Sequence, residues 1–562
     1  MNVISKNLLL YASLILVLII QIPLIMPFFH SGFFPSHDDF QVVRMFEISQ
    51  EIKYGNFPPR WSSGLLYGHG YPVFNFYGPF AYFIGTAFIM LGFNYLVATK
   101  LVFIAYFFIS SLGIFFLIRH LMGLLPALVG AVIFSFVPYR ALDVYVRGAL
   151  GEFAAYSIFP LVFWMNLRLI KSPTSVIRSA IFGLLIGILI ISHSISSFIY
   201  LSFLVAFNLF SLITTEKKYR LKLSLNLVKS LLLALAASCF YWLPVIFEYK
   251  LIKLGDISFP YDRFFVTLSQ IWQSSWGFGG FIEKNPMSLQ LGQVLIVTSM
   301  AALILNIFIK TKLRKLLFFI SVVFLLSIFL ETKMSKILWD KFSILRLFQF
   351  PWRYHILNTI LGSILSASFF YLWKIRFNSG IGRIALFFLV LILTFLSVWE
   401  SYSFFKPRFY SNTPPISETT TWDDEYMPNW VKSKPKEYAA DKIKFIKGEG
   451  EISDINWGYS NKSFIVQTQN SSQIQIAQIY YPGWEALVNT KKTNITYVNE
   501  QGLMNIYIPK GTSNVEFRFI HTWWRLSAEI VSLLGLTYIG WQIIREAFVL
   551  RTKNQLFPKK HK

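Results

Sequence analysis

The apolar runs of this chain constrain its fold more than any other feature of the sequence. Runs of roughly twenty residues recur between residues 7 and 548, and each is long enough to cross a hydrocarbon core of about 30 Å. Only 14% of the 562 residues are charged, whereas soluble domains usually carry about 25%. The pattern excludes a soluble enzyme and predicts an all-α polytopic membrane bundle with about 13–14 transmembrane helices.

The positive charge of the chain indicates how that bundle is oriented. The formal net charge is +24, and Lys and Arg gather in connectors near 214–223, 310–315 and 374–382 and in the C-terminal tail. The positive-inside rule places such connectors in the cytoplasm. Orientation in a membrane therefore explains the charge, and nucleic acid is not expected as a partner.

The same rule assigns the remaining connectors to the external face. These are residues 139–151, 248–290, 331–354 and 403–524. The first run, 7–29, is expected to be an uncleaved helix that leaves the cytoplasm, which makes residues 30–74 the first external loop. The connector 94–97 should also be external, although only the run 75–93 separates it from that loop. Two interpretations stay open, a re-entrant hairpin and a hidden second crossing.

From residue 403 the composition changes, and Asn, Ser and Thr become frequent. Apolar residues alternate with polar ones at 474–476, 504–508 and 515–519, which predicts half-buried strands separated by turns such as Pro482-Gly483. A compact antiparallel β domain is expected at about 440–522. The predicted organisation is a transmembrane domain 1–402, an external β-rich domain 403–524 on the periplasmic or extracellular side, and a final helix with a basic cytoplasmic tail, 525–562.

The first external loop, 30–74, contains the first candidate site. Asp38 and Asp39 precede a helical pattern at 40–53 with one apolar side, typical of a helix that lies along the membrane surface. Ser36 and Asp39 also fit a capping box, so capping and catalysis both stay open for Asp39. The cap does not require Asp38, which is therefore the better candidate for catalysis.

The connector 139–151 and the residue after it contain the second candidate site. Arg140, Asp143, Arg147 and Glu152 place four charges in a short segment between apolar runs. They could pair at the surface, where ion pairs contribute little. Alternatively, Arg147 binds a phosphate and Glu152 faces a substrate cavity. We favour this alternative because ionisable groups at the start of an apolar run are costly and often functional.

Four further residues are candidate substrate ligands. Arg44, Arg60 and His69 share the first external loop with the acidic pair. His193 lies in a tight turn between two apolar runs, where it is either a polar turn residue or functional. Arg353 lies where an external loop enters a helix, and it could be an interface anchor or a phosphate ligand.

Motifs for metals and nucleotides are weak. The eight histidines are scattered, and no His-x-His, His-Glu-x-x-His or Cys pair is present, so no metal ligands are assigned. A carboxylate-rich site for a divalent cation stays open, because His37 and His69 share the loop with the acids. No Gly-rich loop with a phosphate-binding lysine is present, so no nucleotide cofactor is expected.

The order of these segments resembles the GT-C superfamily of polytopic glycosyltransferases. An acidic pair in the first external loop is followed by the segments 79–83, 119–123 and 134–139, and then by a second external loop whose acid precedes a helix. This order is similar to the pattern of protein mannosyltransferases and lipid A aminoarabinose transferases. In those proteins the acid of the second loop is usually Asp, and Glu152 stands nearest that place here.

Bacterial 6-pyruvoyl-tetrahydropterin synthase-related membrane proteins resemble the chain more closely. The resemblance rests on the segments 37–39, 58–61, 68–72 and 147–152. The segment from 480 to 519 resembles the external domain of bacterial membrane proteins implicated in glycosylating cell-envelope polymers. The histidine set that pterin chemistry needs is missing from the sequence.

The resemblance implies a transferase of the bacterial inner (plasma) membrane that moves a sugar from a polyprenyl-phosphate donor to a cell-envelope glycan, lipid or protein acceptor on the external face. It implies Asp38 as general base and Arg147 and Arg353 as stabilisers of the leaving phosphate. Asp39 and Glu152 would orient the acceptor or hold a cation. The alternative is a polytopic transporter or lipid flippase, although transporters tend to place ionisable residues near the midplane between repeated halves.

Overall fold

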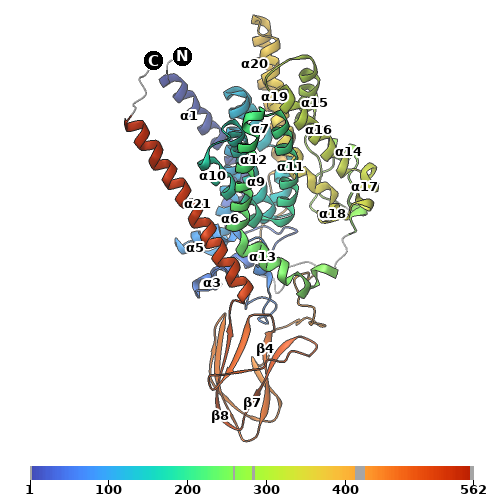
Figure 1. The fold of residues 1–562 in the computed structure, drawn as a ribbon. Coiled ribbons are helices and arrows are strands. Elements are labelled where there is room, and N and C mark those ends of the chain that lie inside the picture. Colours follow the sequence, from blue (N-terminus) through green and yellow to red (C-terminus); the bar gives the residue numbers. More distant parts are fainter. Residues whose placement is uncertain (1–2, 257–259, 281–284, 412–423, 557–562) are drawn as a thin grey trace.

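The helices form a bundle with a β domain attached at one end (Figure 1). The computed structural model describes residues 3–256, 260–280, 285–411 and 424–556. The start of α1 (Val3–Ile19) and the end of α21 (Trp523–Leu556) lie at the end of the bundle opposite the β domain (Figure 1). The β domain and the two chain ends are therefore separated by the length of the bundle.

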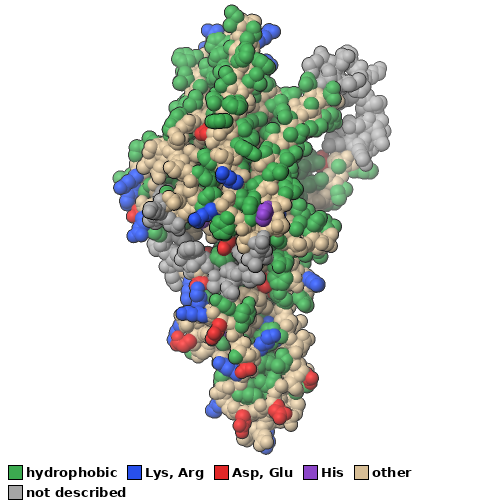
Figure 2. All heavy atoms as spheres, turned by 180° about the vertical axis from the view of Figure 1, so that it is seen from behind, with side chains coloured by type: hydrophobic (Ala, Val, Ile, Leu, Met, Phe, Trp, Pro, Cys, Tyr) green, Lys and Arg blue, Asp and Glu red, His purple; other side chains and the backbone are tan. Residues whose placement is uncertain are grey.

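The described residues contain seven helices that are long and apolar enough to span a membrane. The number rises to ten if each of three bent helix pairs is one span, which is fewer than the expected 13–14. Three further apolar helices are shorter: α5 (Phe80–Met90), α10 (Val176–Ser192) and α15 (Gln293–Phe308). On the face that Figure 2 shows, hydrophobic side chains are abundant over the helical part, and most of the charged side chains in view lie below it. The chain is a multi-pass, mostly helical membrane protein, as the apolar runs predict.

Backbone groups in a bilayer must be satisfied within the segment, which is why the apolar runs form helices. Besides α1 and α21, the long helices are α6 (Tyr95–Met122), α9 (Leu150–Lys171), α11 (Ser194–Thr214), α19 (His355–Arg376) and α20 (Gly380–Ser401). The bent pairs are α7 (Leu124–Ser135) with α8 (Pro138–Ala141), α12 (Lys217–Ala237) with α13 (Cys239–Glu248), and α16 (Arg314–Glu331) with α17 (Lys336–Lys341). The short helices are α2 (Ile22–Ile25), α3 (Gln41–Lys53), α4 (Val73–Phe76), α14 (Leu268–Trp272) and α18 (Ser343–Arg346).

Helix α5 resolves the ambiguity of the run 75–93. Its 11 residues correspond to a length of about 16 Å, which is too short to cross a core of about 30 Å. Lys100, near the start of α6, donates from Nζ to the carbonyls of His30 and Ser31. Helix α6 therefore begins at the end of the bundle where the first run ends, and a second crossing within 75–93 is wrong.

Helix α3 is more deeply buried than a surface helix. It packs against α5 and α6, and its charged residues Arg44, Glu47 and Glu51 are buried. Its N-cap is Phe40, without a side-chain cap. The capping interpretation of Asp39 is therefore wrong. A capping box would need Ser36 at the N-cap of the helix, but the helix begins only at Gln41, after the acidic pair.

The β domain consists of two antiparallel sheets, as the alternating pattern predicts. One sheet has the strand order β1-β4-β7 and the other β2-β3-β8-β5-β6. The strands are β1 (Ile443–Lys447), β2 (Gly450–Trp457), β3 (Asn461–Thr468), β4 (Ser472–Ile479), β5 (Trp484–Val488), β6 (Lys491–Thr493), β7 (Leu503–Ile508) and β8 (Gly511–Phe519). Ile474 of β4 is directly opposite Ile506 of β7, and both side chains are buried.

A buried ion pair holds the β domain against the helices. Arg525, at the start of α21, donates from Nε and Nη2 to the two oxygens of Glu248 in α13, each at 2.7 Å. Tyr481, between β4 and β5, donates its hydroxyl to Glu248 at 2.9 Å. Two parallel hydrogen bonds fix the geometry of an arginine–carboxylate pair, so α13, α21 and the β domain meet at one point.

A second contact, between α3 and the β domain, makes stability depend on pH. Glu51 accepts a hydrogen bond from Asn56 Nδ2 at 2.7 Å, and burial raises the pKa of its carboxyl to about 8. Lys462 of β3 is nearby, and burial lowers the pKa of its ammonium to about 7. An acid with a raised pKa stabilises the folded state below its unfolded pKa, and this stability is lost as the pH rises through the folded value.

We therefore predict that Glu51→Gln, which stays neutral at every pH, melts above the wild type at pH 8.5 and close to it at pH 4.5. The difference should grow by on the order of 1 kcal/mol per pH unit over this window. The measurement is the thermal unfolding of the purified full chain as a function of pH. Lys462 is present in both proteins, and Glu500→Gln, at an exposed residue, is the control. Identical pH profiles for Glu51→Gln and the wild type would contradict the prediction.

Candidate functional site

A buried carboxylate at the start of α9 is the centre of the site. Glu152 is 0% exposed and accepts hydrogen bonds from Arg147 Nη1 at 2.5 Å, from the Tyr139 hydroxyl at 2.6 Å and from Arg353 Nε at 3.0 Å. The donors come from the connector 138–149 and from the loop before α19. The interpretation of these charges as surface pairs is wrong, because Arg147 and Arg353 are also buried.

Asp143 belongs to the same cluster, although the sequence pattern predicts no separate role for it. It lies in a π-helical turn, Leu142–Val146, and its Oδ1 accepts from Arg147 Nη1 at 2.6 Å. Its other oxygen, Oδ2, is buried without a hydrogen-bond partner among the described residues. Turns of this kind are frequent at functional sites. The signal in the sequence is the spacing of four between Asp143 and Arg147, which places both on one helix face.

The first external loop reaches this cluster through its backbone. Asp38 N donates to the carbonyl of Arg147 at 2.7 Å, and His37 N donates to the carbonyl of Val146 at 3.0 Å. The contact requires a glycine, because a Cβ on Gly148 would lie 2.1 Å from Ser36 Oγ. Asp38 is half-buried, and its carboxylate accepts no hydrogen bond from the described residues. Two acidic segments far apart in the sequence thus meet at one place.

Asp39 and Arg44 lie beside Asp38. Burial raises the pKa of the Asp39 carboxyl, and the charge of Asp38 raises it further, whereas Arg44 lowers it. The guanidinium of Arg44 is 4.1 Å from the ring centroid of Tyr77. At the start of α3, Gln41 Nε2 donates to the carbonyl of Gly148 at 3.0 Å. The helix that carries Arg44 is therefore joined to the segment that carries Arg147.

His193 is the polar turn residue of one of the two interpretations, and a functional role for it stays a prediction. Its Nδ1 accepts from the backbone N of Ser196 at 3.2 Å, which caps α11. The same ring packs against the start of α9, where a Cβ on Gly151 would lie 3.5 Å from its Cδ2. His193 is therefore a helix cap that also lies close to Glu152.

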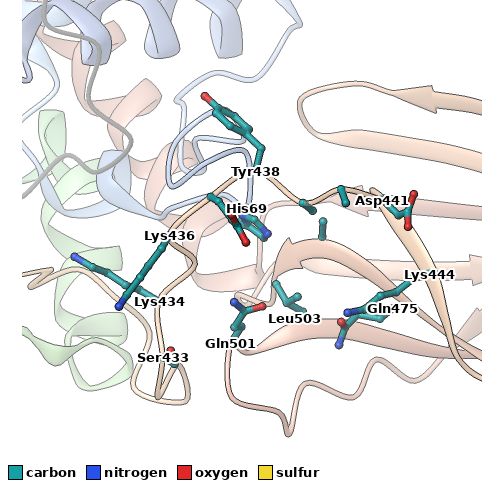
Figure 3. A pocket seen from close by; sticks show the side chains of 14 residues that line it. His69, Ser433, Lys434, Lys436, Tyr438, Asp441, Lys444, Gln475, Gln501 and Leu503 are labelled. Atoms are coloured by element: carbon teal, nitrogen blue, oxygen red, sulfur yellow. The ribbon is translucent and has the colours of Figure 1, made fainter.

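Two predicted residues lie elsewhere. Arg60 donates from Nη2 to Glu529 of α21 at 2.9 Å and to the carbonyl of Phe240 at 2.7 Å. His69 lines a cavity of about 550 Å³ beside the β domain (Figure 3). Burial lowers the pKa of its ring. Of the predicted set, the structure brings together Asp38, Asp39, Arg44, Arg147, Glu152, His193 and Arg353.

In the described part of the chain, no group of three or more His, Cys, Asp or Glu side chains has an arrangement that could hold a metal ion. The ring nitrogens of the two histidines near the acidic pair face backbone carbonyls. His37 Nε2 lies 3.0 Å from the carbonyl of Phe278, and His69 Nδ1 lies 3.0 Å from that of Leu66.

We predict that Glu152→Gln strongly destabilises the protein, because Arg147 and Arg353 would lose the carboxylate between them. Removing one partner of a buried ion pair typically costs about 3–5 kcal/mol. The measurement is the melting temperature and yield of the purified chain, with Glu216→Gln, at an exposed pair with Lys218, as control.

The double variant Glu152→Gln/Arg353→Gln should recover part of the loss, because one unpaired guanidinium is removed as well. A single variant that melts like the wild type would show that Glu152 does not hold the two guanidiniums in place.

Comparison with known proteins shows the family of the chain. The chain is 27% identical over 248 residues to an uncharacterized protein of Lactococcus lactis subsp. cremoris (strain MG1363), and the match covers 42% of this chain and 39% of that protein. Structures of the arabinofuranosyltransferase AftD from Mycobacteria match with TM-scores of 0.46 and 0.45 at 13% identity. The match covers 72% of this chain but only 27% and 29% of those chains. The family model described as "6-pyruvoyl-tetrahydropterin synthase related domain; membrane protein" matches residues 74–404, and the chain belongs to this family.

Proposed function

We propose that the chain is a GT-C-type membrane glycosyltransferase that moves a sugar from a polyprenyl-phosphate donor to a cell-envelope acceptor on the external face. The observation that carries the proposal is the hydrogen bond between Asp38 N and the carbonyl of Arg147, at 2.7 Å. It brings a carboxylate without a hydrogen-bond partner among the described residues next to a cluster of fixed guanidiniums. A base and a phosphate-binding group are what sugar transfer from a lipid phosphate requires.

In this mechanism Asp38 is the general base. It takes the proton of an acceptor hydroxyl while that oxygen forms a bond to the anomeric carbon of the donor sugar. The bond between this carbon and the phosphate oxygen breaks, and the bonding electrons leave with the lipid phosphate. A single direct displacement inverts the anomeric carbon. Asp39, whose pKa burial raises, would orient the acceptor hydroxyl beside Asp38.

The leaving phosphate needs cationic donors. Arg353 uses Nε for Glu152 and Nη1 for Phe348 and Gln349, and its Nη2 donates no hydrogen bond within the described residues. Arg147 lies with its Cζ 4.9 Å from the ring centroid of Trp352. Glu152 would keep both guanidiniums oriented, so that little reorganisation accompanies the growth of charge on the phosphate.

An apolar groove supports a donor with a long hydrocarbon chain. It has a volume of about 500 Å³ and runs between the first loop and the helices α5, α10, α12, α13 and α21. Leu184, Ile188 and Ile191 of α10 line it, and this helix ends at His193 beside the start of α9. A lipid tail in the groove would therefore have its head near the site.

A transporter or flippase is the alternative function. Such proteins tend to place ionisable residues at the midplane, between discontinuous helices of repeated halves. Here the charges meet where the first loop contacts the connector between α8 and α9, and the β domain is attached at the same end as α3 and α5 (Figure 1). This placement favours chemistry at one face over passage through the bundle.

We predict that Asp38→Asn lowers transfer by about 10²–10⁴-fold, the usual contribution of a general base, while the melting temperature changes little because the side chain is half-buried and makes no hydrogen bond within the described residues. The measurement compares envelope polysaccharide and glycolipids of a deletion strain that carries the wild type or the variant. Asp39→Asn is the matched control and should lose less. An unchanged glycan profile after deletion under several growth conditions would count against sugar transfer.

We further predict that Ile188→Trp, which fills the groove, raises the KM for donors with long isoprenoid tails and leaves short-tailed donors unaffected. Ile190→Trp is the control, because Ile190 is equally half-buried on α10 and does not line the groove. The measurement is the rate of transfer from donors of different chain length. Equal effects of the two substitutions would exclude the groove as the site of the tail.

A further inference from the structure

A second cavity lies between the first external loop and the β domain, away from Asp38. Its volume is about 550 Å³, which exceeds the space of a single bound water many times. His69 comes from the first loop, Gln475 from β4 and Leu503 from β7, and residues 433–441 form a further wall (Figure 3). Three separate parts of the chain thus enclose one polar space.

Basic side chains flank this cavity on both sides. Figure 3 shows His69, Gln501 and Leu503 between Lys434 and Lys436 on one side and Gln475 and Lys444 on the other. Lys434 donates to Asp424 at 2.6 Å. For Lys436 and Lys444 no ion pair with a described residue is found, so two ammonium groups are available to a ligand.

The remaining walls suit a saccharide. The amide of Gln475 donates to Asn505 Oδ1 at 2.9 Å, which leaves its carbonyl oxygen to accept from a hydroxyl. The ring of Tyr438 packs near that of Tyr67, with centroids 5.6 Å apart, and points away from Gln475 and Lys444 in Figure 3. Amide and ammonium groups together match a sugar that carries a negative charge.

Acidic groups also line the cavity and disfavour the binding of a small anion. Glu437 and Asp441 belong to its wall, and Asp441 lies at the outer edge in Figure 3. Charges that are exposed interact weakly with one another through water, so each lysine contributes modestly to binding. An extended ligand that reaches both Lys436 and Lys444 forms an ion pair with each and binds more tightly, whereas a single small anion can pair with only one of them.

We propose that this cavity binds a segment of an anionic glycan, a saccharide chain with carboxylate or phosphodiester groups. The binding stands on the cavity alone, and only the role of the glycan as acceptor rests on the proposed function. The segment would lie across the cavity, with its acid groups at Lys436 and Lys444 and a hydroxyl at the side-chain carbonyl oxygen of Gln475.

The test is the binding of defined glycans to the purified full chain in lipid nanodiscs. The probes are a polygalacturonate oligosaccharide, its fully methyl-esterified neutral form, and an oligomer of poly(glycerol phosphate). Either charged probe should bind, and added salt should weaken its binding because exposed charges are screened. The neutral ester should bind at least about threefold more weakly. Preference for one charged probe identifies the acid group, and equal affinity for the neutral ester overturns the proposal.

Substitutions locate the site. Lys436→Gln and Lys444→Gln should each weaken binding by about two- to fivefold, the range for exposed ion pairs. Lys447→Gln is the matched control, because Lys447 is exposed on the same strand as Lys444 and does not line the cavity. An equal loss with Lys447→Gln, or no loss with either cavity lysine, overturns the proposal.

The outcomes also separate this proposal from sugar transfer. Asp38→Asn should leave glycan binding unchanged, since Asp38 does not line the cavity. If the wild type binds the charged probes through Lys436 and Lys444 but deletion leaves envelope glycans unchanged, sugar transfer fails and the binding site stands. If transfer is lost in Asp38→Asn while the lysine substitutions have no effect on binding, the glycan site fails and sugar transfer stands.

Discussion

The carboxylate of Glu152 is the group on which the functional end of the bundle depends. A fully buried negative charge is costly unless it is paired and hydrogen-bonded, and Glu152 meets this requirement with Arg147, Arg353 and Tyr139. These partners come from the connector before α9 and from the loop before α19. The electrostatic requirement of one residue therefore fixes the relative positions of segments that are far apart in the sequence.

The first loop is attached to this fixed frame by backbone hydrogen bonds, which leaves the side chain of Asp38 unconstrained. The bonds from His37 and Asp38 to Val146 and Arg147 need a close approach, which Gly148 permits. A base that must accept a proton benefits from this arrangement, because no donor within the described residues competes for its carboxylate. Glu152 thus holds the guanidiniums of Arg147 and Arg353 in place, whereas the carboxylate of Asp38 stays available for the proposed proton transfer.

The sequence predicts the parts of this fold that depend on local periodicity. Apolar runs predict helices, alternation predicts β4, β7 and β8, and the cost of an ionisable group at the start of an apolar run points to Glu152. Long-range pairing is not visible in the sequence. Nothing in the local sequence indicates that Arg60 pairs with Glu529. Nor does the apolar run 75–93 reveal that α5 occupies only 11 of its residues.

The attachment of the β domain connects the two proposed binding regions. Arg525 and Glu248 are buried, and removing either would leave a buried charge without its ion-pair partner, so the domain has a strong preference for one position. The first loop contacts Arg147 at Asp38 and the β domain at His69, whose carbonyl accepts from Ile479 N at 2.8 Å. The segment between Asp38 and His69 is therefore hydrogen-bonded near both of its ends, which limits how far the cavity beside His69 can move relative to Asp38. A polymer held in that cavity would present its hydroxyls to the base at a distance set by the loop and not by diffusion of a separate domain.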